Sequence, residues 1–369
     1  MTDWGASGRI DTFSLHEVDP FSLQETGNVI DSVDGEGSIT WGTGTDNICS
    51  ATLKVHGKVN RGKLIRVKHA INFPDGSSFG ETLATLFIDQ VTTKTTYGDY
   101  VLDLDCFSTL VRYTDDQTVQ DFVRDIGTPV IDEVTYIVTV DGGHLRVLPG
   151  VDKTRKHTVP IWFPAGTNRA QLLNTLAGWT GNELGVDENG YVTWGPFQPY
   201  AARPVMYTFE DGANCTYLSG VDVTSTSSKA VNRVAARFSR ETKDDSDPYP
   251  LSDFAHVDLP ASYPYSNQRI GRIKAHDLGN VDPCTHDELV AQCERYLYQN
   301  YGAVSYYEFQ HVGIPGLKPG QRVRYVNSTD FPEPIDVTGI IEEISMSLNP
   351  GCMCKTKIRV DSPVEAQVL

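Results

Sequence analysis

The stretch from residue 60 to residue 106 decides the fold that we expect, because its pattern returns near the end of the chain. It reads NRGKLIRV at 60–67, LFIDQV at 86–91 and YVLDLDC at 100–106. The later stretch reads KPGQRVRY at 318–325, GIIEEI at 339–344 and CMCKTKIRV at 352–360. Both combine glycine turns with alternating apolar and polar residues, which is typical of antiparallel β-meanders.

The two stretches align over several special positions. The aligned positions are Gly62 with Gly320, Arg66 with Arg324, Gly98 with Gly351, and Asp89 with the pair Glu342 and Glu343. An internal repeat of this kind predicts one architecture used twice. The alternative explanation is that limited turn chemistry makes two ordinary meanders look alike.

Composition favours a multidomain, mainly β protein. The chain has 369 residues with 32 Gly and 20 Pro, and its apolar residues fall in short runs. It contains no run of about 20 apolar residues, so we expect no membrane insertion. The first residues, Met1 to Trp4, lack the basic and apolar regions of a signal peptide. A net charge of −17 repels phosphate and argues against stable nucleic-acid binding.

Seven cysteines in a chain without an export signal are expected to be reduced. Zinc binding by Cys284, His286, Cys293 and the pair Cys352 and Cys354 is the alternative that we weighed. No CxxC pair is present, so we favour buried, small apolar side chains over a metal site and predict no cofactor.

Changes of pattern divide the chain into four parts. We expect a fold class that is mainly β with α+β insertions: two antiparallel β-barrels and two smaller insert domains. The boundaries are residues 1–112 for the first barrel, 113–203 for an α/β insert, 204–240 with 304–369 for the second barrel, and 241–303 for a helix-containing insert.

Local signals predict the elements of the inserts. Thr118 begins a predicted short helix with Val119, Phe122, Val123 and Ile126 on one face, and 134–140 has the pattern of a strand. Thr167 is expected to cap a second helix, and 183–194 to form a hairpin around an Asn-Gly turn. Thr285 and Glu288 form a capping box before the longest predicted helix.

No catalytic pattern is evident. The chain lacks a nucleophile elbow, a P-loop, a His-Glu-x-x-His motif and a dinucleotide fingerprint. Neighbouring carboxylates such as Glu342 and Glu343 do not by themselves form a glycosidase pair, because adjacent residues of a strand point to opposite faces. We therefore predict that the protein is not an enzyme.

The order of these parts resembles the tail hub family of tailed bacteriophages. The resemblance lies in the barrel, the insert with its LGVDENG hairpin at 184–190, the NRV strand at 232–234, and a second barrel interrupted by a helical segment. The family includes the baseplate hub of contractile tails, the N-terminal hub of siphophage tail-tip proteins and the base of type VI secretion spikes.

The resemblance implies a structural virion protein of the tail tip or baseplate, assembled in the host cytoplasm. Hubs of this family are homotrimers in which three chains present six tube-like barrels to a sixfold tail tube. The implied partners are a distal tail protein ring, the tape measure protein, and tail fibres or a tip protein, while DNA passes through without specific binding. Because the chain stops at Leu369, soon after the second barrel, the resemblance suggests a minimal hub without a lytic extension.

Three chains would carry three times −17, or −51. We hypothesise that acidic side chains line the bore and give passing phosphates no binding site. The candidate lining residues are Asp89, Asp103, Asp105, Glu342 and Glu343. Two other functions stay open: a host-glycan-binding adhesion module with exposed Tyr249, Tyr263 and Tyr265, and a cell-wall hydrolase with paired carboxylates.

Overall fold

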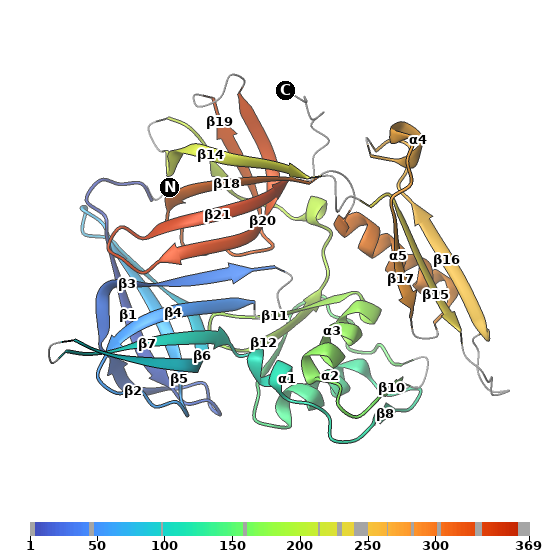
Figure 1. The fold of residues 1–369 in the computed structure, drawn as a ribbon, viewed down its shortest axis with the longest axis horizontal. Coiled ribbons are helices and arrows are strands. Elements are labelled where there is room, and N and C mark those ends of the chain that lie inside the picture. The colour runs from blue at the N-terminus through green and yellow to red at the C-terminus, as the bar shows by residue number, and fades with distance from the viewer. Residues whose placement is uncertain are drawn as a thin grey trace.

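The computed structural model (Figure 1) describes residues 4–43, 48–96, 99–157, 161–212, 215–226, 231–239, 250–263, 265–281, 284–300, 304–328 and 334–360. Gly98 and Tyr249 lie outside these ranges. The protein is mostly β with few helices, so the fold class expected from the sequence is confirmed. Among the described residues, no helix is both long and apolar enough to cross a membrane.

The first unit is an antiparallel sheet made by the N-terminal part of the chain. Its strands, in spatial order, are β3 (Ser32–Gly42), β4 (Cys49–His56), β7 (Asp99–Ser108), β6 (Ser78–Thr96), β5 (Leu64–Asn72), β1 (Ile10–Val18) and β2 (Glu25–Ile30). Leu53, Leu86 and Leu104 are buried because they share one face of this sheet. The alternation in the sequence therefore determines which face packs on the core.

The second unit repeats that arrangement. Its strands, in spatial order, are β14 (Tyr217–Thr226), β18 (Val304–Val312), β21 (Met353–Val360), β20 (Ile335–Ser347) and β19 (Arg322–Asn327), with β13 (Val205–Phe209) parallel to β19. In the first unit, the spatial order β3-β4-β7-β6-β5 places the five strands as first, second, fifth, fourth and third, counted along the chain. In the second unit, the spatial order β14-β18-β21-β20-β19 gives the same sequence of positions.

The units also share their register. Arg66 lies opposite Thr85 in the first unit, and Arg324 lies opposite Thr338 in the second. Each threonine is followed, four residues later, by a residue at which the register with the next strand shifts. In the first unit this residue is Asp89, between Ile88 and Gln90. In the second unit it is Glu342, between Ile341 and Glu343. Both units therefore have a bulge at the same distance from the threonine opposite the arginine. Similar turns alone would not produce this match, so it favours a true internal repeat.

The two units are joined edge to edge. β20 pairs antiparallel with β3, from Glu343 opposite Gly42 to Ser347 opposite Ser38. We call this pairing the internal joint. It makes one 13-stranded sheet, and Figure 1 shows β14, β18, β21, β20, β3, β4, β7 and β6 stacked in that order. A single apolar core extends across the joint, and in the second unit Phe209, Phe309 and Tyr325 form part of it.

The α/β insert has its own core. Its elements are α1 (Val111–Asp115), β8 (Phe122–Arg124), α2 (Val130–Thr139), β9 (Leu145–Val147), β10 (Ile161–Phe163), α3 (Arg169–Thr180), β11 (Asn182–Val186) and β12 (Val192–Pro196), followed by a 3-10 turn at Tyr200–Ala202. The predicted hairpin is confirmed, since β11 pairs with β12. α3 begins two residues after Thr167, and the side chain of Asn168 accepts the capping bond from the Gln171 N–H at 2.7 Å.

Two local predictions in this insert were wrong. The segment after Thr118 is extended and forms β8, with Val119 97% exposed, so no apolar helical face is buried there. Within the segment 134–140, for which a strand is predicted, residues 134–139 belong to helix α2 and Val140 is its C-cap. Val130, Val134 and Val138 recur at helical spacing and are buried, and packing of this face overrides the β preference of valine.

The helical insert consists of β15 (Arg233–Ser239), β16 (Ser252–Asp258), α4 (Asn267–Ile270), β17 (Ala275–Asn280) and α5 (His286–Asn300). The capping box is confirmed: the Thr285 N–H donates to the Glu288 carboxylate at 2.9 Å, and the Glu288 N–H donates to the Thr285 hydroxyl at 3.3 Å. The placement of the 232–234 strand in the second barrel was wrong, because β15 pairs with β16 and β17. Its alternation exposes one face and buries the other on α5 but does not specify which sheet it joins.

The fold makes opposite predictions for two glycines. A Cβ at Gly339 would lie 2.4 Å from the Arg359 carbonyl oxygen, so Gly339→Ala forces β20 away from β21. We expect a loss of about 1–3 kcal/mol in the free energy of unfolding, measured by chemical denaturation. Gly178 lies near the end of α3, where a Cβ meets nothing within 4 Å, so Gly178→Ala should add roughly 0.5–1 kcal/mol. Equal effects of the two changes would contradict this reading of the sheet.

Candidate assembly interface

Several strand edges of the long sheet lack a partner strand among the described residues: the outer sides of β2 and β13, and two further edges in β14 and β6. Among the described strands β14 pairs only with β18, so the segment Val221–Thr226 has no partner strand on its outer side; we call this segment the β14 edge. Beyond Phe87, β6 pairs only with β7, which leaves Gln90–Thr96 open on the side facing away from β7; we call this the β6 edge. Val223 on the β14 edge is 41% exposed, and Thr92, Thr93 and Lys94 are exposed as well.

The β14 edge and the β6 edge are the counterparts of the two strands that form the internal joint. The segment of β20 after its bulge, Glu343–Ser347, corresponds to Gln90–Lys94 after the bulge of β6. β3 corresponds to β14, because each is the first strand of its unit and pairs with the second. Open N–H and C=O groups on an edge favour addition of another strand. Within the chain, β20 pairs with β3. The equivalent pairing between two chains would join the β6 edge of one chain to the β14 edge of the next.

One face of the long sheet is polar and lies opposite the apolar core; we call it the polar face. Its residues in the first unit are Ser38, Thr40, Ser50, Thr52, Lys54, Asp89, Gln90, Thr92, Lys94, Asp103 and Asp105. In the second unit they are Asp222, Thr224, Glu308, Glu342, Glu343, Ser345, Ser347, Lys355 and Lys357. The face continues across the internal joint, where the Thr40 hydroxyl donates to the Ser345 hydroxyl at 3.1 Å.

The five acidic residues named from the sequence lie along this face. Asp105 is opposite Gln90, and both line a shallow hollow together with Asp89. Asp103 pairs with Lys94. Glu343 is opposite Lys357. The Glu342 carboxylate lies 4.0 Å from Arg359 at the end of the face, where both residues also line the cleft between the units and the α/β insert.

The sequence interpretation missed the lysines that share this face. Lys54 pairs with Glu36, and Lys355 pairs with Glu308, whose carboxylate raises the pKa of Lys355. The Lys357 ammonium lies 4.5 Å from the centre of the Tyr306 ring. The signal was present, since Lys355 and Lys357 alternate in the same way as Asp103 and Asp105. The polar face is therefore a Ser- and Thr-rich surface with charges of both signs, on which Lys54, Lys94 and Lys355 are each paired with a carboxylate.

The equivalent arginines of the repeat have different roles. Arg66 is 8% exposed; its guanidinium donates to the Leu23 carbonyl at 3.1 Å, to the Asn189 carbonyl at 3.3 Å and to the Thr85 hydroxyl at 3.0 Å. The Thr85 hydroxyl in turn donates to the Glu188 carbonyl at 2.9 Å. Arg66 thus anchors the hairpin loop of the α/β insert to the first unit.

Arg324 instead makes an exposed, two-pronged ion pair with Asp336 at 2.8 and 2.6 Å, which raises the pKa of Arg324 and lowers that of Asp336. The glycines of the repeat also differ in backbone conformation. Gly320 has a positive φ of +83°, whereas Gly62 is not among the residues with positive φ. Backbone register is repeated, but side-chain function is not.

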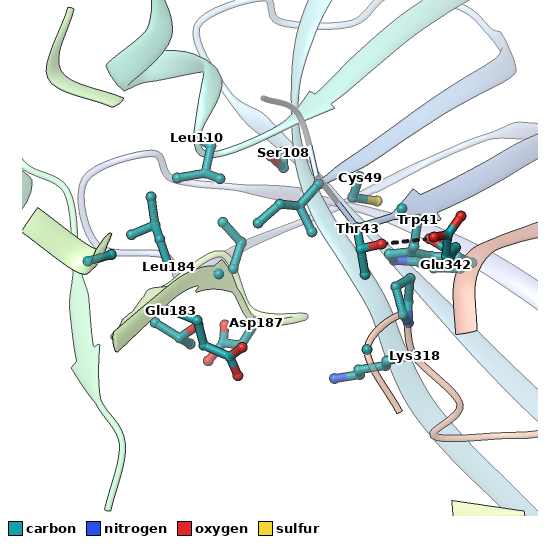
Figure 2. Close-up of a pocket in the computed structure, with 18 of the residues that line it drawn as sticks. Trp41, Thr43, Cys49, Ser108, Leu110, Glu183, Leu184, Asp187, Lys318 and Glu342 are labelled. Atoms are coloured by element: carbon teal, nitrogen blue, oxygen red, sulfur yellow. Dashed lines mark hydrogen bonds between the residues drawn. The ribbon is translucent and has the colours of Figure 1, made fainter. Parts of the chain in front are cut away.

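A cleft of about 640 Å³ lies where the first unit, the second unit and the α/β insert meet. Figure 2 shows Glu183 and Asp187 on the insert side and Lys318 on the side of the second unit. Its charges are paired: Lys318 with Glu188 at 2.5 Å and Arg203 with Glu183 at 2.9 Å. The described lining residues include no histidine, and burial raises the pKa of the Cys49 thiol. The cleft is therefore a seam between domains that is held by ion pairs across it.

The aromatic cluster considered for glycan binding is not a rim of exposed rings. Tyr263 and Tyr265 are partly buried against the core of the helical insert, and Tyr249 is outside the described residues. That insert is held to the α/β insert by Arg295 of α5, which donates to the carbonyls of Ala177 and Gly178 at 3.2 and 3.0 Å. These carbonyls end helix α3, where a cation is electrostatically favoured.

Two matching units with two inserts, joined edge to edge, define a phage-tail type of fold. The chain has this fold in common with solved phage and prophage tail proteins and with spike proteins of the VgrG type. The sequence itself matches no family model and no curated protein.

Three similar structures cover nearly the whole chain. A tail protein from Neisseria meningitidis MC58 has a TM-score of 0.67 at 13% identity, over 95% of this chain and 97% of that one. The 43 kDa tail protein of prophage MuSo2 from Shewanella oneidensis has a TM-score of 0.64 at 13% identity, over 94% and 97%. Prophage tail protein gp18 from Listeria monocytogenes EGD-e has a TM-score of 0.58 at 10% identity, over 95% and 96%.

The two repeat arginines supply a matched test of the anchoring role. Arg66→Ala leaves the Leu23 and Asn189 carbonyls without their charged donor, and we expect a loss of about 2–4 kcal/mol in the free energy of unfolding. Arg324→Ala removes only a solvent-screened pair and should leave the denaturation midpoint nearly unchanged. Hydrogen exchange in the 187–191 loop should rise in the first variant alone. Unchanged exchange there would show that Arg66 does not hold the loop.

Proposed function

We propose that this chain is a structural subunit of a phage tail tip or baseplate and acts without catalysis. Three copies close a ring that joins the sixfold tail tube, or a distal tail ring, to a threefold tip. The observation that carries the proposal is the internal joint, together with the open β14 and β6 edges that are its counterparts. The fold shared with phage tail proteins supports the same role.

The ring closes if the strand pairing of the internal joint also occurs between neighbouring chains. Within a chain, the fourth strand of the second unit pairs with the first strand of the first unit. Between chains, the fourth strand of the first unit, β6, would pair with the first strand of the second unit, β14. Every unit then has the same neighbours, and a heterologous contact of this kind closes into a ring when the rotation permits. Three copies present six units, the number that the sequence resemblance implies.

The internal joint specifies the register of the joint between chains. Each residue pair of the internal joint can be replaced by the equivalent residues of β6 and β14, because the strand pairings of the two units match. The resulting pairs are Gln90 with Thr226, Val91 with Ser225, Thr92 with Thr224, Thr93 with Val223 and Lys94 with Asp222. Lys94 then meets a carboxylate across the joint, and the exposed Val223 gains a partner strand. Complementary charge at the transferred position supports this register over a one-residue slip, which would turn every side chain to the other face.

In such a ring, the polar face would line a conduit for DNA and the tape measure protein. Paired charges and hydroxyl groups offer phosphate no cluster of unpaired cations. The acidic-lining hypothesis is thereby modified: low affinity comes from charge pairing on the face as well as from net negative charge. Further proposed partners are the distal tail ring, and fibres or a tip protein, in an assembled virion.

Cysteine pairs test the proposed register directly. In a Cys215→Ser background, which removes an exposed thiol, Thr93→Cys with Val223→Cys should give covalent dimers and trimers on mild oxidation. Directly opposed antiparallel residues lie at a separation that a disulfide can bridge. Non-reducing electrophoresis and mass photometry, on the purified chain and on assembled particles, measure the outcome.

The matched control is Thr92→Cys with Val223→Cys, in which the two thiols face opposite sides of the sheet. Charge exchange is a second readout: Lys94→Glu or Asp222→Lys alone should weaken the trimer at least tenfold, and the double exchange should restore it. Equal cross-linking by both cysteine pairs, or none in either preparation, would overturn the proposed joint.

The conduit role predicts an effect on DNA passage. Asp105→Lys with Glu343→Lys adds unpaired cations to the polar face, and a trimer would carry three copies of each. We expect phage particles with these changes to assemble but to eject DNA several-fold more slowly at low salt, in a fluorescence ejection assay. Lys153→Glu, on an exposed loop of the insert, is the control. Unchanged ejection kinetics in intact particles would remove the conduit role of this face.

A further inference from the structure

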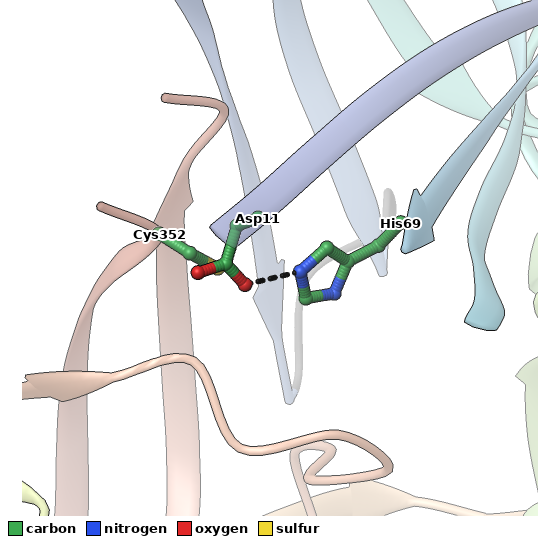
Figure 3. Close-up of side chains that lie close together, drawn as sticks. All are labelled: Asp11, His69 and Cys352. Atoms are coloured by element: carbon green, nitrogen blue, oxygen red, sulfur yellow. Dashed lines mark hydrogen bonds and ion pairs between the residues drawn. The ribbon is translucent and has the colours of Figure 1, made fainter. Parts of the chain in front are cut away.

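Three potential metal ligands meet beside the internal joint, away from the open edges. Asp11 of β1, His69 of β5 and Cys352 of the turn before β21 offer a carboxylate oxygen, an imidazole nitrogen and a sulfur within 4.8 Å of one another (Figure 3). Their exposed fractions are 4%, 1% and 0%. Two belong to the first unit and one to the second, so the cluster bridges the two units.

The backbone of the second unit holds Cys352 in this position. Cys352 has a φ of +41°, which a residue with a side chain rarely adopts. Its N–H donates to the Asn349 carbonyl at 2.8 Å, and its carbonyl accepts from the Gly313 N–H at 2.8 Å. A Cβ at Gly313 would lie 2.4 Å from the Cys352 sulfur, so only glycine leaves room for the thiol.

The ligands of the first unit are oriented by further contacts. His69 Nε2 lies 2.7 Å from Asp11 Oδ1, and His69 Nδ1 lies 3.4 Å from a carboxylate oxygen of Glu81. The Phe13 ring stacks on the imidazole with 4.8 Å between centres. Arg9 donates to Asp11 through Nε and Nη2. A carboxylate on the far nitrogen of a histidine is the usual outer partner of a metal-binding imidazole.

We propose that Asp11, His69 and Cys352 bind a zinc ion, with the neighbouring Cys354 thiol as the fourth ligand. Cys354 is 2% exposed and within hydrogen-bonding reach of Cys352. Sulfur and imidazole together favour zinc over calcium or magnesium, and four ligands of this kind suit its tetrahedral geometry. Zinc–ligand distances are about 2.0–2.3 Å, so the four side chains would rearrange around the ion when it binds.

Charge balance is compatible with this ion. Two thiolates and one carboxylate carry a charge of −3 against the +2 of Zn²⁺, and the Arg9 guanidinium, which donates to both oxygens of Asp11, supplies the remaining positive charge. Each cysteine that binds gives up its proton to solvent. The ion would fasten β1 and β5 to the start of β21, in addition to the backbone bonds between β3 and β20. The alternative zinc site considered from the sequence combined Cys352 and Cys354 with Cys284, His286 and Cys293. The structure separates these groups, because Cys284 and Cys293 pack in the helical insert.

Cobalt substitution and zinc analysis of the full chain test the site. The protein purified with zinc present should retain about one equivalent per chain. After removal of zinc under reducing conditions, added Co²⁺ should give thiolate-to-metal absorption near 350 nm and intense visible bands typical of tetrahedral sites. Cys352→Ser should at least halve the near-ultraviolet band, because Cys354 is then the only proposed thiolate ligand. His69→Gln should weaken Co²⁺ binding at least tenfold, and chelation should lower the Tm of the wild type but not of Cys352→Ser.

Cys215→Ser is the matched control, since that thiol is exposed and outside the cluster; its metal content and spectra should equal those of the wild type. Circular dichroism establishes that each variant is folded. If a variant fails to fold, the wild type alone decides: no retained zinc and no thiolate–cobalt band would mean that the cluster is a hydrogen-bonded contact only. Zinc retained equally by Cys352→Ser would also overturn the assignment.

Discussion

The structure depends on one constraint: the edge of a β-sheet has backbone groups that need hydrogen-bond partners. Inside the chain the constraint is met at the internal joint, where five residues of β20 align with five of β3. The core continues beneath this pairing, so the two units behave as one packed body. Within the part of the chain that the structure describes, Val221–Thr226 of β14 and the far half of β6 have no partner strand on one side, and the proposed joint between chains would meet the constraint there.

The bulges explain how each long strand serves two neighbours. β6 pairs with β5 before Asp89 and is open on that side afterwards; β20 pairs with β19 before Glu342 and with β3 afterwards. A bulge bends a strand and increases its twist. An acidic residue at each bulge is tolerated because the extra side chain lies on the polar face, where it does not enter the core.

The inserts are attached through backbone recognition. Arg66 binds the carbonyl of Asn189 in the loop of the α/β insert, and Arg295 binds carbonyls at the end of α3. Arginine suits this task because its planar group has several fixed donors and keeps its charge when partly buried. Both contacts bridge residues more than 100 positions apart in the chain.

The sequence by itself determined the mainly β class, the repeated meander and the local caps, because alternation, glycine turns and the Thr285 capping box are encoded by near neighbours. It also placed Asp103 and Asp105 opposite the core. Only the tertiary structure decided that 134–140 is helical, that β15 belongs to the helical insert, and that Lys94 pairs with Asp103. It alone brought Asp11, His69 and Cys352 together. These outcomes depend on which distant surface buries a given face, and a pattern of period two or 3.6 does not carry that information.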